Sequence, residues 1–188
     1  MSVDRVAIFV DAGYLEKVLE KEFSRIHIDY GKLATEMAAG KEILRTYYYN
    51  CAPHQSNPPT TDEVNRKANA DKFFAALCKL PRFEVRLGRL AKRSCDNCGK
   101  SFFQQKRADL MLCVDLVSLS AKQQISTAIL ITGDSDFMPA VISAKDSGVL
   151  VHLYHGGLAN PPHQDLFNLC DERTQIDRAL VDRLKRIK

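Results

Sequence analysis

Short and almost wholly apolar runs alternate along this chain with longer segments that have helical spacing. The run Val6 to Val10 stops directly at Asp11, and the similar run from Thr127 to Ile131 is followed by Thr132 and a turn. A strand that is apolar on both sides has to be buried on both faces of its sheet. The alternation therefore predicts an α/β fold with a mostly parallel sheet covered by helices on both faces.

The same periodicities place the individual elements. Strands are expected at residues 6–10, 42–49, 83–90, 127–131 and 148–154. Helices are expected at residues 14–23, 31–39, 62–80, 107–122, 137–146 and 175–188. The polar and basic segment 91–105 is expected to form a hairpin or a protruding loop. In a sheet of this kind the ligand lies beyond the carboxyl ends of the strands, so the residues just after each strand are the candidate site residues.

The chain has 188 residues, of which 45% are hydrophobic and 27% charged, as in ordinary globular proteins. A chain of this length buries about 70% of its surface on folding, enough for one core without disulfides. We expect one domain over residues 1–160 and a C-terminal helical tail, residues 161–188, packed on it. No apolar run approaches the roughly twenty residues of a membrane span, and the N-terminus lacks an export signal. We therefore expect a cytoplasmic protein with reduced cysteines and no membrane partner.

Acidic residues stand where two of the predicted strands end. Asp11 follows the first strand directly, and Asp134 and Asp136 follow the strand at 127–131. Asp109 opens the helix that precedes that strand, so its carboxylate can point to the same edge of the sheet. If the two strands are neighbours, the four carboxylates converge there.

Clustered carboxylates repel one another, and without a cation the repulsion raises their pKa values until some of them are protonated. Carboxylate and water oxygens favour Mg²⁺ or Mn²⁺, and Mg²⁺ is commonly bound by few carboxylates together with phosphate oxygens of a substrate. Such a site favours metal-assisted hydrolysis of a phosphodiester. The competing role is helix capping by Asp11, Asp134 or Ser135, which does not explain why acids gather at several places on one edge.

Asp115 lies on the same predicted helix as Asp109, in an otherwise apolar stretch. Six residues turn a helix by about 240° from its starting direction, so the two carboxylates cannot share one face. We expect Asp115 to be a buried carboxylate paired to a base or a backbone donor. The alternative is a supporting role beside the metal ligands.

Three segments together resemble the NYN domain family, a branch of the PIN-like nucleases. They are residues 8–14 (IFVDAGY), 105–115 (QKRADLMLCVD) and 129–137 (ILITGDSDF), in the order that the family has. The resemblance implies a three-layer α/β/α, PIN-like (Rossmann-like) fold and a Mg²⁺- or Mn²⁺-dependent nuclease site over residues 1–160. Carried over residue by residue, it implies that Asp11, Asp109, Asp134 and Asp136 are the catalytic, metal-binding acids. We therefore expect an endoribonuclease that acts on single-stranded or structured RNA.

The chain departs from the family pattern at Tyr14, where members often have Asn. The departure removes a polar side chain that would contact metal-bound water or substrate, although the tyrosine hydroxyl could replace part of it or the ring could stack on a base. It keeps a non-catalytic, regulatory RNA-binding module open as the alternative function. A phosphatase of the haloacid dehalogenase type is disfavoured, because Gly13 stands where that class needs a second Asp.

Basic residues concentrate between positions 79 and 107. This segment contains nine basic and two acidic residues, so its local charge is +7, whereas the net charge of the whole chain is +4. The rest of the chain therefore carries a net charge of −3. This asymmetry suits a polyanion, whose phosphates position it without reading its sequence. The competing interpretation is a solvated strand face and turn. The candidate RNA-backbone contacts are Arg86, Arg89, Lys92, Arg93, Lys100, Lys106 and Arg107.

Cys95 and Cys98, followed by Gly99, have the spacing of a zinc knuckle. Cys51 and His54 form the other pair at similar spacing. The two pairs would bind Zn²⁺ through three thiolates and one imidazole if their loops meet, or two chains could pool their Cys95 and Cys98 across the axis of a homodimer. The alternative is a hairpin with two free thiols, because two ligands alone do not make a site.

Overall fold

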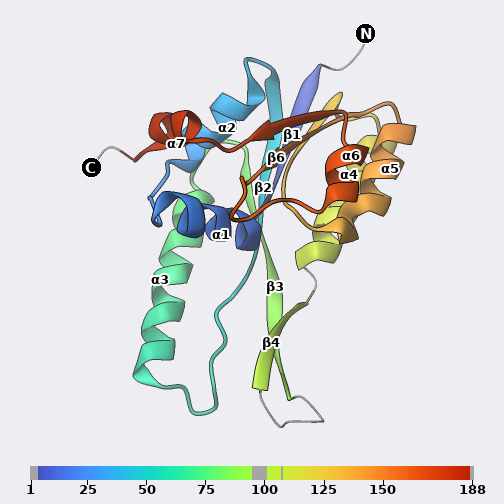
Figure 1. Ribbon diagram of the computed structural model, residues 1–188. Helices are drawn as coiled ribbons and strands as arrows, with labels where there is room; N and C mark the ends of the chain where they lie inside the picture. Colours follow the sequence, from blue (N-terminus) through green and yellow to red (C-terminus); the bar gives the residue numbers. More distant parts are fainter. Residues whose placement is uncertain (1–3, 95–100, 107, 187–188) are drawn as a thin grey trace.

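The computed structural model describes residues 4–94, 101–106 and 108–186, and these form a seven-stranded sheet in the order β4-β3-β2-β1-β5-β6-β7. Figure 1 shows helices on both of its sides. The strands are β1 (Arg5–Asp11), β2 (Glu42–Cys51), β3 (Phe83–Ser94), β4 (Ser101–Lys106), β5 (Thr127–Ile131), β6 (Leu150–His155) and β7 (Glu172–Gln175). Six of the described strands are parallel, and β4 runs antiparallel to β3. The predicted α/β class with a mostly parallel sheet is confirmed.

The helices are α1 (Ala12–Phe23), α2 (Tyr30–Ala38), α3 (Thr61–Leu77), α4 (Ala108–Ala121), α5 (Met138–Asp146), α6 (Gln164–Leu169) and α7 (Arg178–Leu184), with a short 3₁₀ turn, η1 (Ser135–Phe137). In Figure 1, α1, α2, α3 and α7 lie on one side of the sheet and α4, α5 and α6 on the other. The layered α/β/α arrangement expected from the family resemblance is therefore present.

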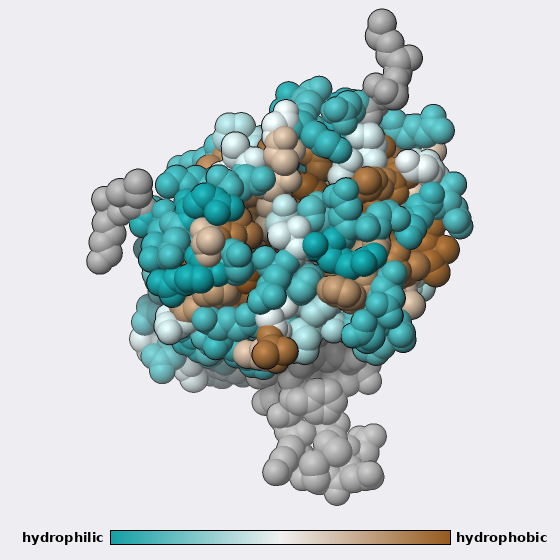
Figure 2. All heavy atoms as spheres, turned by 45° about the horizontal axis from the view of Figure 1, so that its top comes forward, coloured by the Kyte–Doolittle hydropathy of each residue, from teal (hydrophilic) through white to brown (hydrophobic). Residues whose placement is uncertain are grey.

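Each face of the sheet has its own core, because successive side chains of a strand point to opposite faces. In β1, Val6, Ile8 and Val10 pack in the core beneath α1 and α2. Ala7 and Phe9 pack in the core beneath α4 and α5. This double burial explains why the central strands are apolar at every position. The outer surface in Figure 2 is largely hydrophilic, with apolar residues in separate patches.

Two elements project beyond the carboxyl edge of the sheet (Figure 1), namely the β3–β4 hairpin and the first turns of α3. The buried residues of α3, Phe74 and Leu77, both lie in its last turn. Strand β3 continues to Ser94 and pairs antiparallel with β4, with Arg89 opposite Lys106. Residues 95–100, in the middle of the segment expected to form a hairpin or a protruding loop, lie outside the described residues.

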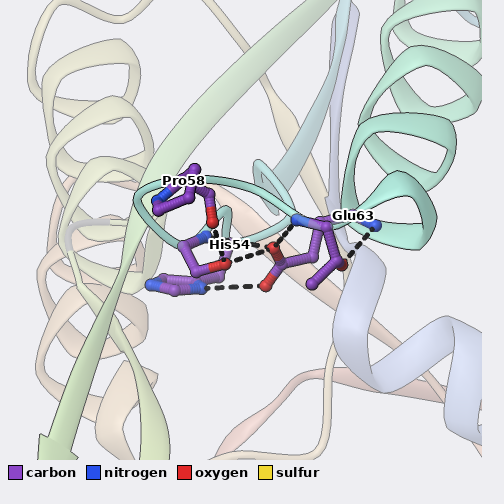
Figure 3. A network of polar contacts seen from close by, with 5 residues as sticks. His54, Pro58 and Glu63 are labelled. Atoms are coloured by element: carbon purple, nitrogen blue, oxygen red, sulfur yellow. Dashed lines mark hydrogen bonds and ion pairs between the residues drawn. The ribbon is translucent and has the colours of Figure 1, made fainter.

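A compact polar network fixes the loop before α3 (Figure 3). The Glu63 carboxylate accepts hydrogen bonds from the hydroxyl of Ser56 at 2.5 Å and from the backbone N–H of Thr60 at 2.9 Å, and Thr60 caps the helix in return. Together these bonds, chiefly the one from Ser56, lower the pKa of Glu63 to about 2. The loop that leaves β2 is therefore anchored to the start of the projecting helix.

The C-terminal part differs from the prediction. The expected helix at 175–188 is wrong at its start, because Gln175 ends strand β7 and Asp177 caps α7, which begins at Arg178. Neither α6 nor β7 was predicted. The helix has six residues, and the strand is an exposed, polar edge without apolar alternation. No helix in the described ranges is long and apolar enough to cross a membrane.

Candidate active site

The carboxyl ends of β1 and β5 lie side by side, because the two strands pair directly, with Val10 opposite Ile131. Asp11 ends β1, and the turn that holds Asp134 follows β5. Asp109 lies in the first turn of α4 and reaches this edge from one helical layer. The neighbouring strands on which the predicted convergence of acids depends are therefore present.

Asp11 is held through both of its carboxylate oxygens. One accepts the backbone N–H of Tyr14 at 3.2 Å and so caps α1, as the capping interpretation expects. The other accepts the hydroxyl of Thr132 at 3.1 Å. Burial raises the pKa of Asp11, against the opposing effect of these hydrogen bonds. Capping and site formation are thus compatible roles of one carboxylate, whose orientation is fixed by neutral donors.

Thr132 is the residue that links the two strand ends, and sequence reasoning missed it. Its side chain is fully buried. While its hydroxyl donates to Asp11, the same oxygen accepts the backbone N–H of Asp134 at 3.3 Å. Asp134 in turn caps the following 3₁₀ turn by accepting the N–H of Asp136 at 3.0 Å. A hydroxyl residue between an apolar strand and two acids is the signal that could have found it.

The four acids act on one another electrostatically. Burial raises the pKa of Asp109, and the charges of Asp11, Asp134 and Asp136 raise it further. One turn along α4, the pKa of the Cys113 thiol is also raised, by burial and then by Asp109 and Asp136. The raised pKa values of Asp109 and Cys113 indicate that the electrostatic potential at this edge of the sheet is negative.

The acids open into a cleft of about 430 Å³. Asp11, Asp109 and Asp134 line it directly, whereas Asp136 lies beside it. The other lining residues are Gly13, Tyr14, Lys17, Gly133, Ser135, Asn160, Pro161 and His163. The cleft therefore brings together β1, β5, α1, α4 and the loop between β6 and α6.

The side chains at the cleft can be compared with the ligand preferences of the divalent cation that the family resemblance implies. Carboxylate oxygens that repel one another are the ligands that a hard divalent cation neutralises, so the chemistry of Asp11, Asp109 and Asp134 fits Mg²⁺ or Mn²⁺. Over residues 4–94, 101–106 and 108–186, no three His, Cys, Asp or Glu side chains are spaced as a ready ligand group. The acids therefore fit a divalent cation in the chemistry of their oxygen atoms and in their charge.

Tyr14, at the position where the family often has Asn, donates its backbone N–H to Asp11 but directs its side-chain hydroxyl to the loop after β6. Its hydroxyl donates to the carbonyl of Asn160 at 3.0 Å and accepts the N–H of Gly156 at 2.9 Å. Its ring lies against Gly133, where a Cβ atom would come within 2.3 Å of a ring carbon. The hydroxyl is therefore used to hold the loop, and glycine at position 133 makes room for the ring.

Asp115 is paired to a base, as predicted, but its side chain is only partly buried. It accepts the hydroxyl of Tyr49 at 2.9 Å and the guanidinium of Arg86 at 3.3 Å. Arg86 also forms an ion pair with Glu84 at 2.6 Å and lies over the ring of Tyr47. Asp115 thus belongs to a separate network between α4, β2 and β3, and the charge of Arg86 is already balanced there.

The other predicted site residues are placed only in part. Arg89, Lys92, Arg93 and Lys106 lie on the paired backbones of β3 and β4. Lys100, Arg107 and both cysteines of the predicted zinc knuckle, Cys95 and Cys98, lie outside the described residues. Within the described chain, Cys51 is buried at the end of β2, and the His54 imidazole lies 3.9 Å from the Glu63 carboxylate (Figure 3).

Comparison with known proteins points to one family and one fold. The model of the NYN domain family matches residues 5–177. A crystal structure of a protein of unknown function from Vibrio parahaemolyticus RIMD 2210633 superposes with a TM-score of 0.67 at 22% identity, covering 94% of this chain and 95% of that chain. A search of curated proteins found no match. At this identity the likeness to the Vibrio structure shows the fold alone.

Proposed function

Because this chain belongs to the NYN domain family, within the PIN-like superfamily, we propose that it is a metal-dependent endoribonuclease. Family membership indicates a nuclease-like function related to RNA. The finer proposal rests on the gathering of Asp11, Asp109 and Asp134 at the cleft with Asp136 beside it, where burial and then the charges of the other three acids raise the pKa of Asp109. A divalent cation held by these acids would relieve this repulsion.

In this mechanism Asp11, Asp109, Asp134 and Asp136 would hold Mg²⁺ or Mn²⁺. When bound there, the ion would supply an activated water and neutralise charge on the phosphate during hydrolysis. Thr132 and the N–H of Tyr14 fix the orientation of Asp11, so little reorganisation is needed when substrate arrives. The acids also keep anions out of the cleft unless a cation is present, which couples substrate entry to metal binding.

We further propose that the RNA backbone extends from the cleft along the β3–β4 hairpin. This hairpin projects from the same carboxyl edge (Figure 1) and carries most of the basic residues between positions 79 and 107. Phosphate contacts of this kind give affinity without sequence preference. Zinc at the cysteine pairs, a homodimer and a cytoplasmic location stay predictions from the sequence.

A non-catalytic RNA-binding module is the second candidate function. It is favoured by Tyr14, whose hydroxyl bonds to the loop after β6, so that the polar side chain often found at this position in the family is replaced by a structural link. In that case the acids would serve the fold or a weak cation site, and RNA would bind without being cut.

Cleavage of a circular single-stranded RNA tests the proposal, because a circle has no end for an exonuclease. The wild-type protein, Asp134→Asn and the control Asp146→Asn are incubated with Mn²⁺, with Mg²⁺ or with chelator. Asparagine still caps a helix turn, so the fold is retained at position 134, and Asp146 is an exposed residue at the end of α5.

The proposal predicts that the wild type and Asp146→Asn linearise the circle in a metal-dependent manner and that Asp134→Asn does not. Intact circles in every lane, with RNA binding retained in a gel-shift assay, would contradict the nuclease and support the binding module. Cleavage of linear RNA alone would contradict the endonucleolytic mode.

A further inference from the structure

One wall of the cleft carries hydrogen-bond donors in place of acids. Lys17 comes from α1, on the opposite side of the sheet from the helix that carries Asp109. Asn160 and His163 come from the loop between β6 and α6. We call these three residues the donor wall. The cleft is therefore lined by acids on one part and by a cation and two N–H-bearing side chains on another.

Lys17 lies near the acids without being paired to one. Its charge opposes the effect of burial on the Asp11 pKa, which places the ammonium within electrostatic range of that carboxylate. In the part of the chain that the structure describes, no carboxylate lies within 4.0 Å of the Lys17 ammonium. A strongly hydrated, mobile point charge of this kind is suited to a phosphate oxygen.

The hydrogen bonds around His163 make its Nε2 atom a hydrogen-bond donor. The Nδ1 atom accepts the backbone N–H of Asp165 at 3.2 Å, so the neutral ring carries its proton on Nε2. The backbone N–H of His163 donates to the carbonyl of Gly133 at 2.8 Å. His163 is thereby held beside the turn that presents Asp134, while the Asp165 carboxylate lies 3.7 Å from Nδ1.

Asn160 carries an amide nitrogen whose hydrogen-bonding capacity is unused. Its Nδ2 atom is buried and makes no hydrogen bond with any residue that the structure describes. A buried amide without a partner costs about 1–3 kcal/mol. Because Asn160 lines the cleft, a rotation of its side chain toward the cleft would give this amide an oxygen acceptor supplied by a ligand. The backbone carbonyl of Asn160 is already bonded to the Tyr14 hydroxyl.

The loop that presents Asn160 and His163 is held in place before any ligand arrives. Gly156 donates its N–H to Tyr14 at 2.9 Å, and Gly157 donates its N–H to Glu22 at 2.9 Å. A Cβ atom at Gly156 would come within 2.6 Å of the carbonyl oxygen of Asn160, so the loop closes tightly on itself. Donors fixed in this way lose little entropy when a ligand binds.

We propose that Lys17, Asn160 and His163 bind the RNA phosphate next to the one that is cleaved. The inference rests on the proposed function, which assigns the scissile phosphate to the acids and their cation. A nucleic acid in this cleft of about 430 Å³ has to place a neighbouring phosphate close by, and the donor wall offers that phosphate one positive charge and two N–H groups. The site thereby fixes the strand on one side of the bond to be cut.

Binding measurements with charge-matched variants test the donor wall. Fluorescence anisotropy of a short labelled single-stranded RNA is recorded over a range of salt concentrations, with Ca²⁺ as the cation and a gel to verify that the RNA stays intact. The variants are Lys17→Gln, His163→Gln and the control Lys122→Gln. Lys122 is exposed and follows α4, about 20 Å along that helix from Asp109.

Lys17→Gln is expected to weaken RNA binding severalfold and to lower the slope of log affinity against log salt by about 0.7, the loss of one phosphate contact on a single strand. His163→Gln is expected to weaken binding with a smaller change of slope. Lys122→Gln should match the wild type. Lys17→Gln and Lys122→Gln with equal affinities and slopes would overturn the proposal.

The result of the RNA-binding measurements can be distinguished from the result of the RNA cleavage assay. If the wild type fails to cleave RNA but Lys17→Gln still lowers the salt slope, phosphate binding by the donor wall is supported, and the nuclease proposal, with its scissile phosphate, is contradicted. If metal-dependent cleavage occurs and Lys17→Gln binds RNA as the wild type does, the nuclease stands and the donor wall does not. A titration with inorganic phosphate, followed through the backbone amide NMR signals of Gly133 and Asn160, gives a readout that needs no RNA.

Discussion

Helix α4 carries two aspartates with opposite surroundings. Asp115 accepts hydrogen bonds from the Tyr49 hydroxyl and the Arg86 guanidinium, so a base balances its charge. Asp109 lies six residues earlier. Burial raises its pKa, and the charges of three other acids raise it further. Among the side chains that the structure describes, no basic group lies within 4.0 Å of the Asp109 carboxylate.

The paired carboxylate of Asp115 therefore supports the fold, whereas the unbalanced charge of Asp109 lowers the stability of the folded protein. A paired carboxylate is an ordinary structural element, whereas repelling acids persist where function requires them and are a sign of a functional site. The same helix thus connects a stabilising network at β2 and β3 with an unbalanced cluster at β1 and β5. The two regions should therefore respond differently to mutation, to metal and to pH.

The largest effect is expected from exchanging one carboxylate in each region. Asp109→Asn should lower RNA cleavage at least about a hundredfold, since even residues that merely support metal ligands change activity by 10–100-fold, and should leave the free energy of unfolding unchanged or increased. Asp115→Asn should leave cleavage within a few-fold and lower the free energy of unfolding by about 1 kcal/mol, because the network is partly exposed. Denaturant unfolding without metal and an RNA cleavage assay measure both. Equal behaviour of the two variants would contradict the comparison.

Added metal should stabilise the folded protein through the acid cluster at the cleft and not through the network around Asp115. At a concentration a hundred times its dissociation constant, Mn²⁺ should raise the free energy of unfolding by about 2.7 kcal/mol in the wild type and in Asp115→Asn. Asp134→Asn should respond much less because it lacks one of the proposed ligands. Thermal melts with Mn²⁺ and with chelator measure the shift. An equal shift in Asp134→Asn would place the metal elsewhere.

Thr132→Val should disturb the cluster without removing an acid. The variant leaves one oxygen of Asp11 and the N–H of Asp134 without their partner, so we expect cleavage to fall by about 10–100-fold, as for other groups that orient metal ligands. Thr132→Ser keeps the hydroxyl and serves as the control. Valine and serine variants with the same activity would show that the buried hydroxyl does not orient Asp11.

The pH dependence of stability should show the repulsion directly in the metal-free protein. The pKa values of Asp11 and Asp109 are raised on folding, so the folded state binds protons more tightly than the unfolded chain, in which carboxyl groups titrate near about 3.9. The contribution of these groups to stability is therefore present at low pH and is lost as the pH rises through the raised pKa values. Asp109→Asn should flatten this part of the curve in denaturant titrations. An unchanged curve would contradict the electrostatic account.

The smallest effect is expected at Tyr14. Tyr14→Phe keeps the ring against Gly133 but removes the hydroxyl that holds Gly156 and Asn160, so we expect a loss of about 1 kcal/mol in unfolding free energy. Hydrogen exchange at the Gly156 amide should become faster, and RNA affinity should fall a few-fold because the donor wall loosens. Unchanged exchange at Gly156 would show that the hydroxyl does not hold the loop.

Much of this site could be predicted from the sequence because its signals are local. An apolar run that stops at Asp11, and another followed by Asp134 and Asp136, place acids at strand ends, and the pairing of β1 with β5 brings those ends together. The helix rotation between Asp109 and Asp115 likewise follows from residue spacing alone.

The donor wall and the loop that carries it could not be predicted in this way. The bond from Tyr14 to Asn160 joins residues 146 positions apart, and no local pattern encodes such a contact. Strand β7 is polar and exposed, so it lacks the alternation that identifies a strand. His163 and Lys17 reach the cleft only through the arrangement of β6, α6 and α1 in three dimensions.

The most direct test of the central claim is anomalous diffraction from crystals of the wild-type protein soaked in Mn²⁺. We expect a manganese peak in the cleft, contacted by the carboxylates of Asp11, Asp109 and Asp134, and no peak at Asp115, whose charge Arg86 already balances. A cleft without manganese, at a concentration that supports RNA cleavage in solution, would contradict the account.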